Sequence, residues 1–137
     1  GFTKTINFYL VNKTFYLVDL PGYGFATGSV QDRKNIQQLI DWYLTYPDLE
    51  QRQIIVLIID AKVGFTELDH QMLTYLQDLE KDIIIVANKI DKLKKNDLAR
   101  QLKNIQELAH PHQVIPISNE DKTGIPALIN ALFNKTV

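Results

Sequence analysis

The sequence predicts a three-layer α/β fold, in which a mostly parallel sheet is covered by helices on both faces and carries one antiparallel hairpin at its edge. Continuous apolar runs at residues 54–60, 83–87 and 114–117 have the length and composition of strands that are buried on both faces. Segments with apolar residues at helical spacing separate these runs, as in sheets whose parallel strands are joined by crossover helices.

The edge hairpin is expected at the start of the chain. Two β-rich runs, residues 6–11 and 14–19, are joined by Asn12 and Lys13, and a two-residue connection of this kind indicates a β-hairpin. Pro21 and Gly22 follow, and this pair is typical of a loop rather than of a continuing strand.

Four helices are expected, and two of them begin with a recognisable cap. Ser29 with Asp32, and Thr66 with Asp69, match the capping-box pattern. Pro126 suits the first turn of the last helix. The side chains expected to face the core are Ile36, Leu39, Ile40, Tyr43 and Leu44, then Leu68, Met72, Leu76 and Leu79, then Leu98, Leu102, Ile105 and Leu108, and finally Leu128, Ile129, Leu132 and Phe133.

Composition bounds the class of protein. The 137 residues suit one domain with a single core, and 45% hydrophobic with 23% charged residues is an ordinary globular balance. Lys plus Arg number 15 and Asp plus Glu 16, so the net charge of 15 − 16 = −1 gives no electrostatic reason by itself to expect a nucleic acid, DNA included, or an anionic membrane as partner. There are no cysteines, which excludes thiolate metal sites and fits a reducing cytoplasm. The apolar runs are far shorter than the ~20 residues of a membrane span.

The strongest chemical signal is Asn88-Lys89-Ile90-Asp91, directly after a predicted strand. A carboxylate at this edge can accept hydrogen bonds from the N1–H and the exocyclic amine of guanine, a pair that adenine does not present. Ser118 and Asn119 follow the next strand, and ligands of open parallel sheets bind beyond such strand ends. The alternative is a plain strand-to-helix turn, where Asn and Asp are common.

A second polar group, Asp19-x-x-Gly22, follows the hairpin. Its carboxylate could reach Mg²⁺ through water, and its glycine N–H could approach a phosphate oxygen closely. A turn without ligand is the alternative here too.

These segments carry a resemblance to a known family. Residues 3–8, TKTINF, and residues 18–26, VDLPGYGFA, together with the Asn88-Lys89-x-Asp91 box and the Ser118 loop, resemble the EngB (YihA/YsxC) family of bacterial ribosome-assembly GTPases of the TRAFAC class. The resemblance covers essentially the whole chain. It implies a Ras-like fold of the P-loop NTPase type, with GTP/GDP and Mg²⁺ as cofactors.

The resemblance also implies roles for individual residues and for the protein. Its implied function is hydrolysis of GTP to GDP and phosphate in the cytoplasm, in assembly of the large ribosomal subunit through that subunit or its rRNA, with a link to cell division and septation. Tyr23 stands where many GTPases place a water-orienting glutamine, so no catalytic residue is assigned. The implied ligands are Thr3 directly on Mg²⁺, Asp19 on Mg²⁺ through water, Gly22 on the γ-phosphate, and Asn88, Lys89, Asp91, Ser118 and Asn119 around guanine.

The sequence departs from the family at three points. Phe2 replaces a basic residue, Lys4 replaces a glutamine, which makes Thr5 a rival to Thr3, and Asn119 replaces a small residue. None of the six glycines precedes a lysine, so the phosphate-binding GxxxxGK[ST] motif is absent. We therefore expect a single GTPase domain over residues 1–137 that lacks its first strand and phosphate loop and is inactive as given.

Two other functions remain open at this point. One is an assembly or interaction module that derives from a GTPase and works without nucleotide. The other is a dinucleotide-binding domain, because Gly22-x-Gly24 follows a strand, although Thr27 stands where the third glycine belongs.

Overall fold

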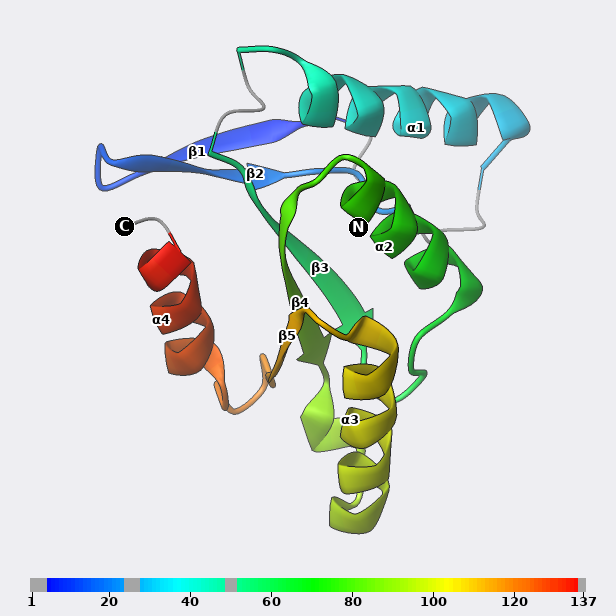
Figure 1. Cartoon of the computed structure of the whole chain (residues 1–137), viewed down its shortest axis with the longest axis vertical. Coiled ribbons are helices and arrows are strands. Elements are labelled where there is room, and N and C mark those ends of the chain that lie inside the picture. Colours follow the sequence, from blue (N-terminus) through cyan, green and yellow to red (C-terminus); the bar gives the residue numbers. More distant parts are fainter. Residues whose placement is uncertain (1–4, 24–27, 49–51, 136–137) are drawn as a thin grey trace. The chain divides into compact units, whose positions relative to one another are not determined.

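The computed structural model describes residues 5–23, 28–48 and 52–135, which belong to two compact units, Gly1–Gln51 and Arg52–Val137 (Figure 1). Helices and strands alternate along the chain, and the α/β class predicted from the sequence is confirmed. No described helix is both long enough and apolar enough to cross a membrane.

The first unit contains the predicted hairpin and one helix. Strands β1 (Asn7–Val11) and β2 (Phe15–Asp19) pair antiparallel, and helix α1 spans Val30–Thr45. The prediction of a two-residue connection was wrong, because Val11 pairs with Phe15 and leaves three residues in the turn. Asn12 and Lys13 both have positive φ, and the Thr14 N–H donates to the Val11 carbonyl at 2.9 Å, which closes this longer turn.

Helix α1 begins where its capping box places it. The Ser29 side chain accepts from the Asp32 N–H, and the Asp32 carboxylate accepts from the Ser29 N–H in return. An edge-on aromatic contact joins this helix to the hairpin, with the Phe8 ring 6.0 Å from that of Tyr43, and a second contact lies within the hairpin, with the Phe8 ring 6.2 Å from that of Tyr16. Such contacts combine apolar burial with a favourable ring geometry.

The second unit is a three-stranded parallel sheet with helices on both faces. Its strands are β3 (Ile54–Asp60), β4 (Asp82–Asn88) and β5 (Gln113–Pro116), in the order β3-β4-β5. Helices α2 (Glu67–Asp78) and α3 (Lys95–Ala109) lie on one side of this sheet and α4 (Ile125–Lys135) on the other (Figure 1). A short 3₁₀ turn, η1 (Ile90–Lys92), follows β4.

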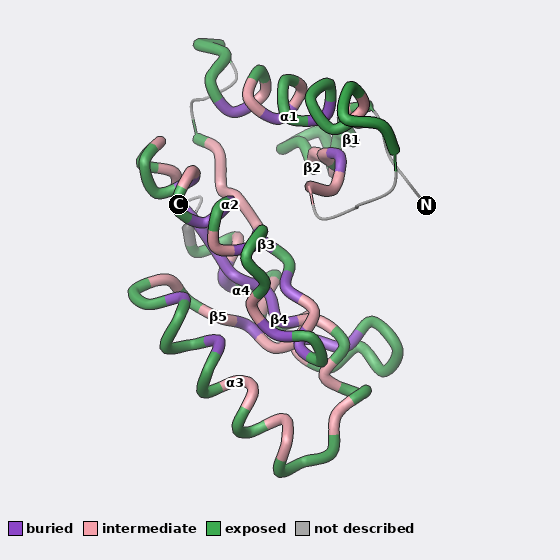
Figure 2. The backbone as a smooth tube through the Cα atoms, turned by 90° about the vertical axis from the view of Figure 1, so that its right-hand side faces the viewer, coloured by how far each residue is buried: buried purple, intermediate pink, exposed green. Residues whose placement is uncertain are grey.

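The core of this unit is centred on β4, in which the residues from Ile83 to Ala87 are all buried (Figure 2). Because successive side chains of a strand point to opposite faces, Ile84 and Val86 share one face. They pack there with Ile115 of β5 and Ala131 of α4. A strand covered on both faces must be apolar throughout, which explains the uninterrupted run in the sequence.

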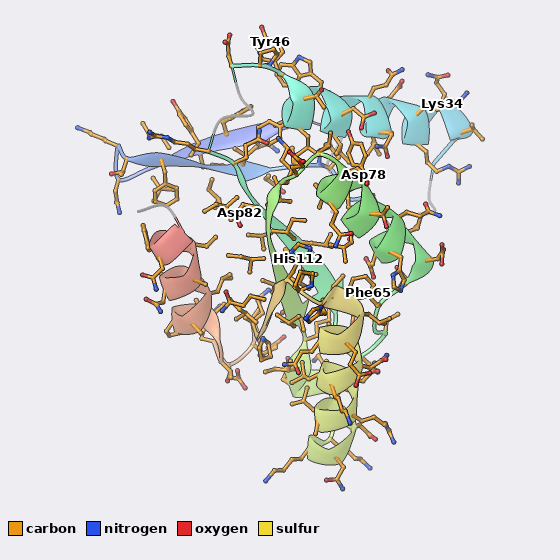
Figure 3. All side chains as sticks on the ribbon, viewed as in Figure 1. Lys34, Tyr46, Phe65, Asp78, Asp82 and His112 are labelled. Atoms are coloured by element: carbon orange, nitrogen blue, oxygen red, sulfur yellow. The ribbon has the colours of Figure 1, made fainter. Side chains whose placement is uncertain are left out.

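Contacts between helices and strands also fix the edges of the unit. The Gln77 amide nitrogen lies 2.9 Å from Nε2 of His112, which is labelled in Figure 3, and this contact ties the end of α2 to the start of β5. The Thr66–Asp69 capping box at the start of α2 is confirmed.

Four side chains expected in the core are exposed instead: Leu68, Leu108, Ile129 and Phe133.

The two sets of strands are hydrogen-bonded as two separate sheets. In the described part of the chain, β1 and β2 form one sheet and β3, β4 and β5 the other.

Candidate functional site

Three loops meet at the carboxyl edge of the parallel sheet. Register places Asp60, the last residue of β3, beside Asn88, the last residue of β4. The Ala61 N–H donates to the Asn88 carbonyl at 2.8 Å, and the Ile90 N–H donates to the carbonyl of Ile117, beyond β5, at 3.3 Å. Backbone hydrogen bonds therefore hold the loops after β3, β4 and β5 against one another.

The loop after β4 takes an unusual backbone conformation at Lys89. This residue is left-handed, with φ 66° and ψ 33°, and it precedes the 3₁₀ turn η1. The Asn88 side chain accepts from the Lys89 N–H at 2.8 Å, so the asparagine stabilises the turn that it begins. A left-handed non-glycine residue costs free energy that the surroundings must offset, and such residues cluster at functional sites.

The same loop brings Asp91 to Ser118, 27 residues further along the chain. The Ser118 hydroxyl donates to Asp91 Oδ1 at 2.9 Å, and the Lys92 ammonium lies 3.6 Å from Asp91 Oδ2. Ser118 is fully buried, whereas 19% of the Asp91 side chain is exposed. The Asp91 carboxylate is thus held in place by Ser118 and Lys92. Because each of its oxygens carries two lone pairs, it can still accept hydrogen bonds from a ligand.

The loop after β5 closes on itself beside this carboxylate. The Ser118 N–H donates to the Thr123 carbonyl at 2.9 Å, and the Asp121 N–H donates to the Ser118 hydroxyl oxygen at 3.4 Å. Gly124 follows with φ +80°, and a Cβ there would collide with the Pro116 carbonyl oxygen. Asn119, at the tip, is exposed.

Asp60 belongs to this site, although the sequence analysis did not single it out. Its Oδ2 lies 3.1 Å from the Lys89 ammonium, and its Oδ1 accepts from the Lys62 and Val63 N–H groups at 2.9 and 3.3 Å. Burial raises the pKa of the Asp60 carboxyl, but the hydrogen bonds from Lys89, Val63 and Lys62 outweigh burial and hold that pKa below its ordinary value. An acidic residue at the end of an apolar strand was the available signal.

The remaining predicted site residues belong to the first unit and are described within it. Asp19 ends β2 and is exposed, Gly22 is half-buried in the following loop, and Thr5 is exposed before β1. Thr3 lies outside the described residues. The predicted site therefore divides between the units, with the guanine residues in the second and the metal residues in the first.

The groups described at the carboxyl edge of the parallel sheet offer hydrogen-bonding partners to a ligand. Asp91, Asn88 and the backbone groups of the Ser118 loop offer hydrogen-bonding partners at one edge of the sheet. Among the described residues, no group of three or more His, Asp or Glu side chains could hold a metal ion. Asp19 and Thr5 supply oxygen atoms of the kind that Mg²⁺ prefers, and such sites are usually completed by phosphate oxygens and water.

A family model described as "50S ribosome-binding GTPase" matches residues 1–89. Proteins called "Probable GTP-binding protein EngB" are similar over most of the chain. The one from Natranaerobius thermophilus is 38% identical, covering 90% of this chain and 65% of its own, and the one from Lactobacillus helveticus is 40% identical, covering 98% and 70%. The chain thus spans about two thirds of the length of these curated relatives.

Two solved structures share the fold. A crystal structure of a probable GTP-binding protein EngB has a TM-score of 0.80 and 21% identity, and the match covers 97% of this chain and 82% of that one. A structure of Era in complex with MgGDPNP and a segment of 16S ribosomal RNA has a TM-score of 0.74 and 21% identity, covering 98% of this chain and 45% of that one. At this level of identity the two structures support the α/β fold.

Proposed function

The chain belongs to the EngB family of GTP-binding proteins, and we propose that it recognises the guanine base through Asn88, Lys89, Asp91 and Ser118. One observation carries the proposal: the buried Ser118 hydroxyl holds Asp91 Oδ1 at 2.9 Å, at the sheet edge where ligands of such folds bind. A carboxylate fixed in this way can accept from the N1–H and the exocyclic amine of guanine. Adenine presents no such donor pair and would leave the carboxylate unpaired.

The other residues of the loop have supporting roles in this proposal. Asn88 stabilises the turn, the Lys89 stem lies against the base or the ribose, and the Asn119 backbone closes over the base. The family's likeness to ribosome-binding GTPases supports a ribosomal partner, and the finer role that we propose is assembly of the large subunit, in the cytoplasm and linked to cell division. Hydrolysis of GTP to GDP and phosphate is the corresponding reaction.

Magnesium and the phosphates belong to the other half of the proposed site. Asp19 would hold Mg²⁺ through water, Gly22 would contact the γ-phosphate, and Thr3, with Thr5 as its rival, would be the direct metal ligand. Bound Mg²⁺ would neutralise phosphate charge. Because the 137 residues contain no GxxxxGK[ST], we propose that they bind GTP weakly and hydrolyse it negligibly by themselves.

A second candidate is an assembly module that works without nucleotide. The two functions differ in whether the chain distinguishes bases. The first requires that guanosine monophosphate (GMP) shift the amide resonances of Asn88, Lys89 and Asp91 more strongly than adenosine monophosphate (AMP) does, and the second requires no such preference.

The substitution Asp91→Asn tests the first candidate directly. An amide suits xanthine, whose position-2 carbonyl accepts a hydrogen bond where guanine donates one. We expect the affinity for GMP in an NMR titration to fall about tenfold or more, and xanthosine monophosphate to become the preferred ligand. Asp78→Asn, a like change of charge at the exposed end of α2 (labelled in Figure 3), is the control and should leave both affinities unchanged. Unchanged GMP affinity in Asp91→Asn would contradict the assignment of guanine recognition to Asp91.

A further inference from the structure

A charged contact in the second unit involves the loop after β4, residues 88–92, which we call the base-recognition loop. The Lys89 ammonium is 3.1 Å from Asp60 Oδ2, although the two residues are 29 positions apart. The parallel register of β3 and β4, which pairs Asp60 with Asn88, brings them together. The register of the sheet therefore places the two backbones close enough for their side chains to meet.

The Asp60 end of this pair is fixed in the structure. Besides Lys89, its carboxylate accepts from two backbone N–H groups, and its carbonyl accepts from the Gly64 N–H at 2.8 Å. The Gln101 amide, from α3, donates to the Ala61 carbonyl at 3.0 Å and to the Lys62 carbonyl at 3.3 Å. The turn after β3 is thus held both by its own backbone and by a helix.

The Lys89 side chain, by contrast, has conformational freedom that can be restricted. Its side chain is 56% exposed, and a lysine stem has many rotamers in water. An exposed ion pair adds little to the stability of a fold, so the value of this contact has to be sought elsewhere. A fixed Asp60 carboxylate that favours one orientation of Lys89 would order the lysine stem before a ligand binds. Such ordering favours binding because it lowers the entropy cost of fixing the side chain in the complex.

We propose that Asp60 is a positioning residue for guanine-nucleotide binding, which acts by holding in place the side chain of Lys89 in the base-recognition loop. The inference rests on the proposed function, because Asp60 acts only through Lys89 and the role of Lys89 is itself part of that proposal. Asp60 itself touches neither base nor phosphate in this proposal. Its carboxylate serves as the anchor, and the turn held by Gln101 serves as its support.

The substitution Asp60→Asn separates this role from a merely structural one. An asparagine oxygen can still accept from the Lys62 and Val63 N–H groups, but it carries no charge for Lys89. Asp97→Asn is the matched control, because it removes the same charge from an exposed ion pair, with Arg100, on α3. Both variants change the net charge equally, so a general electrostatic effect would appear in both.

The measurement is a double-mutant cycle on GMP affinity, followed by NMR titration of the full chain. Asp60→Asn should weaken GMP binding about threefold to tenfold, and Asp97→Asn by less than about twofold. In a Lys89→Met background, Asp60→Asn should have no further effect, because the group on which it acts is gone. Independently of ligand, Lys89→Met should raise the pKa of the Asp60 carboxyl, read from its ¹³C resonance.

The outcomes separate the two hypotheses. A parent chain that prefers GMP over AMP, combined with unchanged affinity in Asp60→Asn, would overturn this inference and leave the proposed function standing. An equal loss in the parent and Lys89→Met backgrounds would also overturn it, since Asp60 would then act without the lysine. A parent chain with no preference for GMP overturns both.

Discussion

At the scale of single residues, backbone conformation helps to explain how the loops after β3, β4 and β5 keep their shape. Lys89 and Lys122 are left-handed non-glycine residues, and Gly64 and Gly124 have φ of +87° and +80°. All four lie in the loops after β3, β4 and β5. Because only glycine adopts this region without strain, the two glycines are the positions where a side chain would be costly.

Gly124 and Gly64 give a matched test of this argument. An alanine at either position has the same unfavourable φ, but at Gly124 its Cβ collides with the Pro116 backbone, whereas at Gly64 it meets the end of the Gln101 side chain at 3.1 Å. We expect Gly124→Ala to lower the free energy of unfolding by about 3 kcal/mol or more and Gly64→Ala by about 1–2 kcal/mol. Urea unfolding measures both, and equal losses would show that the Pro116 contact is relieved cheaply.

At the scale of elements, β3 differs from β4 in how it is covered. Both strands are apolar along their length, yet Ile58 is 60% exposed while its neighbour Ile59 is 1% exposed. Strand β4 lies in the middle of the three-stranded sheet, and β3 lies at its edge with one hydrogen-bonded neighbour in the described part of the chain. An apolar run alone does not distinguish these two positions.

The pair Ile58 and Ile59 turns this difference into a prediction. Truncation to alanine removes the same atoms and the same strand preference at both positions, so the difference between them measures burial. Ile59→Ala should lower the free energy of unfolding by about 2–5 kcal/mol, whereas Ile58→Ala should lower it by less than about 1 kcal/mol. Denaturant titration of both variants checks this, and a similar loss at Ile58 would show that this side chain is covered in solution.

At the scale of the whole molecule, the proposed site draws on both units. The guanine residues Asn88, Lys89 and Asp91 lie in the Arg52–Val137 unit, and Asp19 and Gly22 lie in the Gly1–Gln51 unit. In the function that we propose, base recognition requires only residues of the second unit, and the residues assigned to Mg²⁺ and the γ-phosphate belong to the first. Most of the charge of a nucleotide lies on its phosphates, and no residue of the second unit is assigned to them.

This division predicts how the 137 residues treat GTP. Base contacts remain, but the backbone cradle and the lysine of a GxxxxGK[ST] motif are not among these residues. We expect calorimetric titration with GTP and Mg²⁺ to give an affinity little better than that for GMP. Submicromolar binding by this chain would show that its phosphate site lies in residues that we have not assigned.

The sequence by itself determined the local features of this protein. Helix starts at Ser29 and Thr66, the strand runs, and the Asn88-Lys89-x-Asp91 box are each set by residues a few positions apart, and periodicity and capping express such short-range physics. The family resemblance likewise depends on short motifs. Predicted strand positions were correct to within one residue, which placed the candidate ligands at the right edge of the sheet.

Only the tertiary structure decided which distant residues meet. The ion pair of Asp60 with Lys89 depends on the register of two strands, and the hydrogen bond of Ser118 with Asp91 depends on how two loops close. The exposure of Leu68 and Leu108 depends on which helical faces the sheet covers. Sequence periodicity identifies an apolar side chain without naming its neighbours, because packing, register and loop closure are set by the whole chain at once.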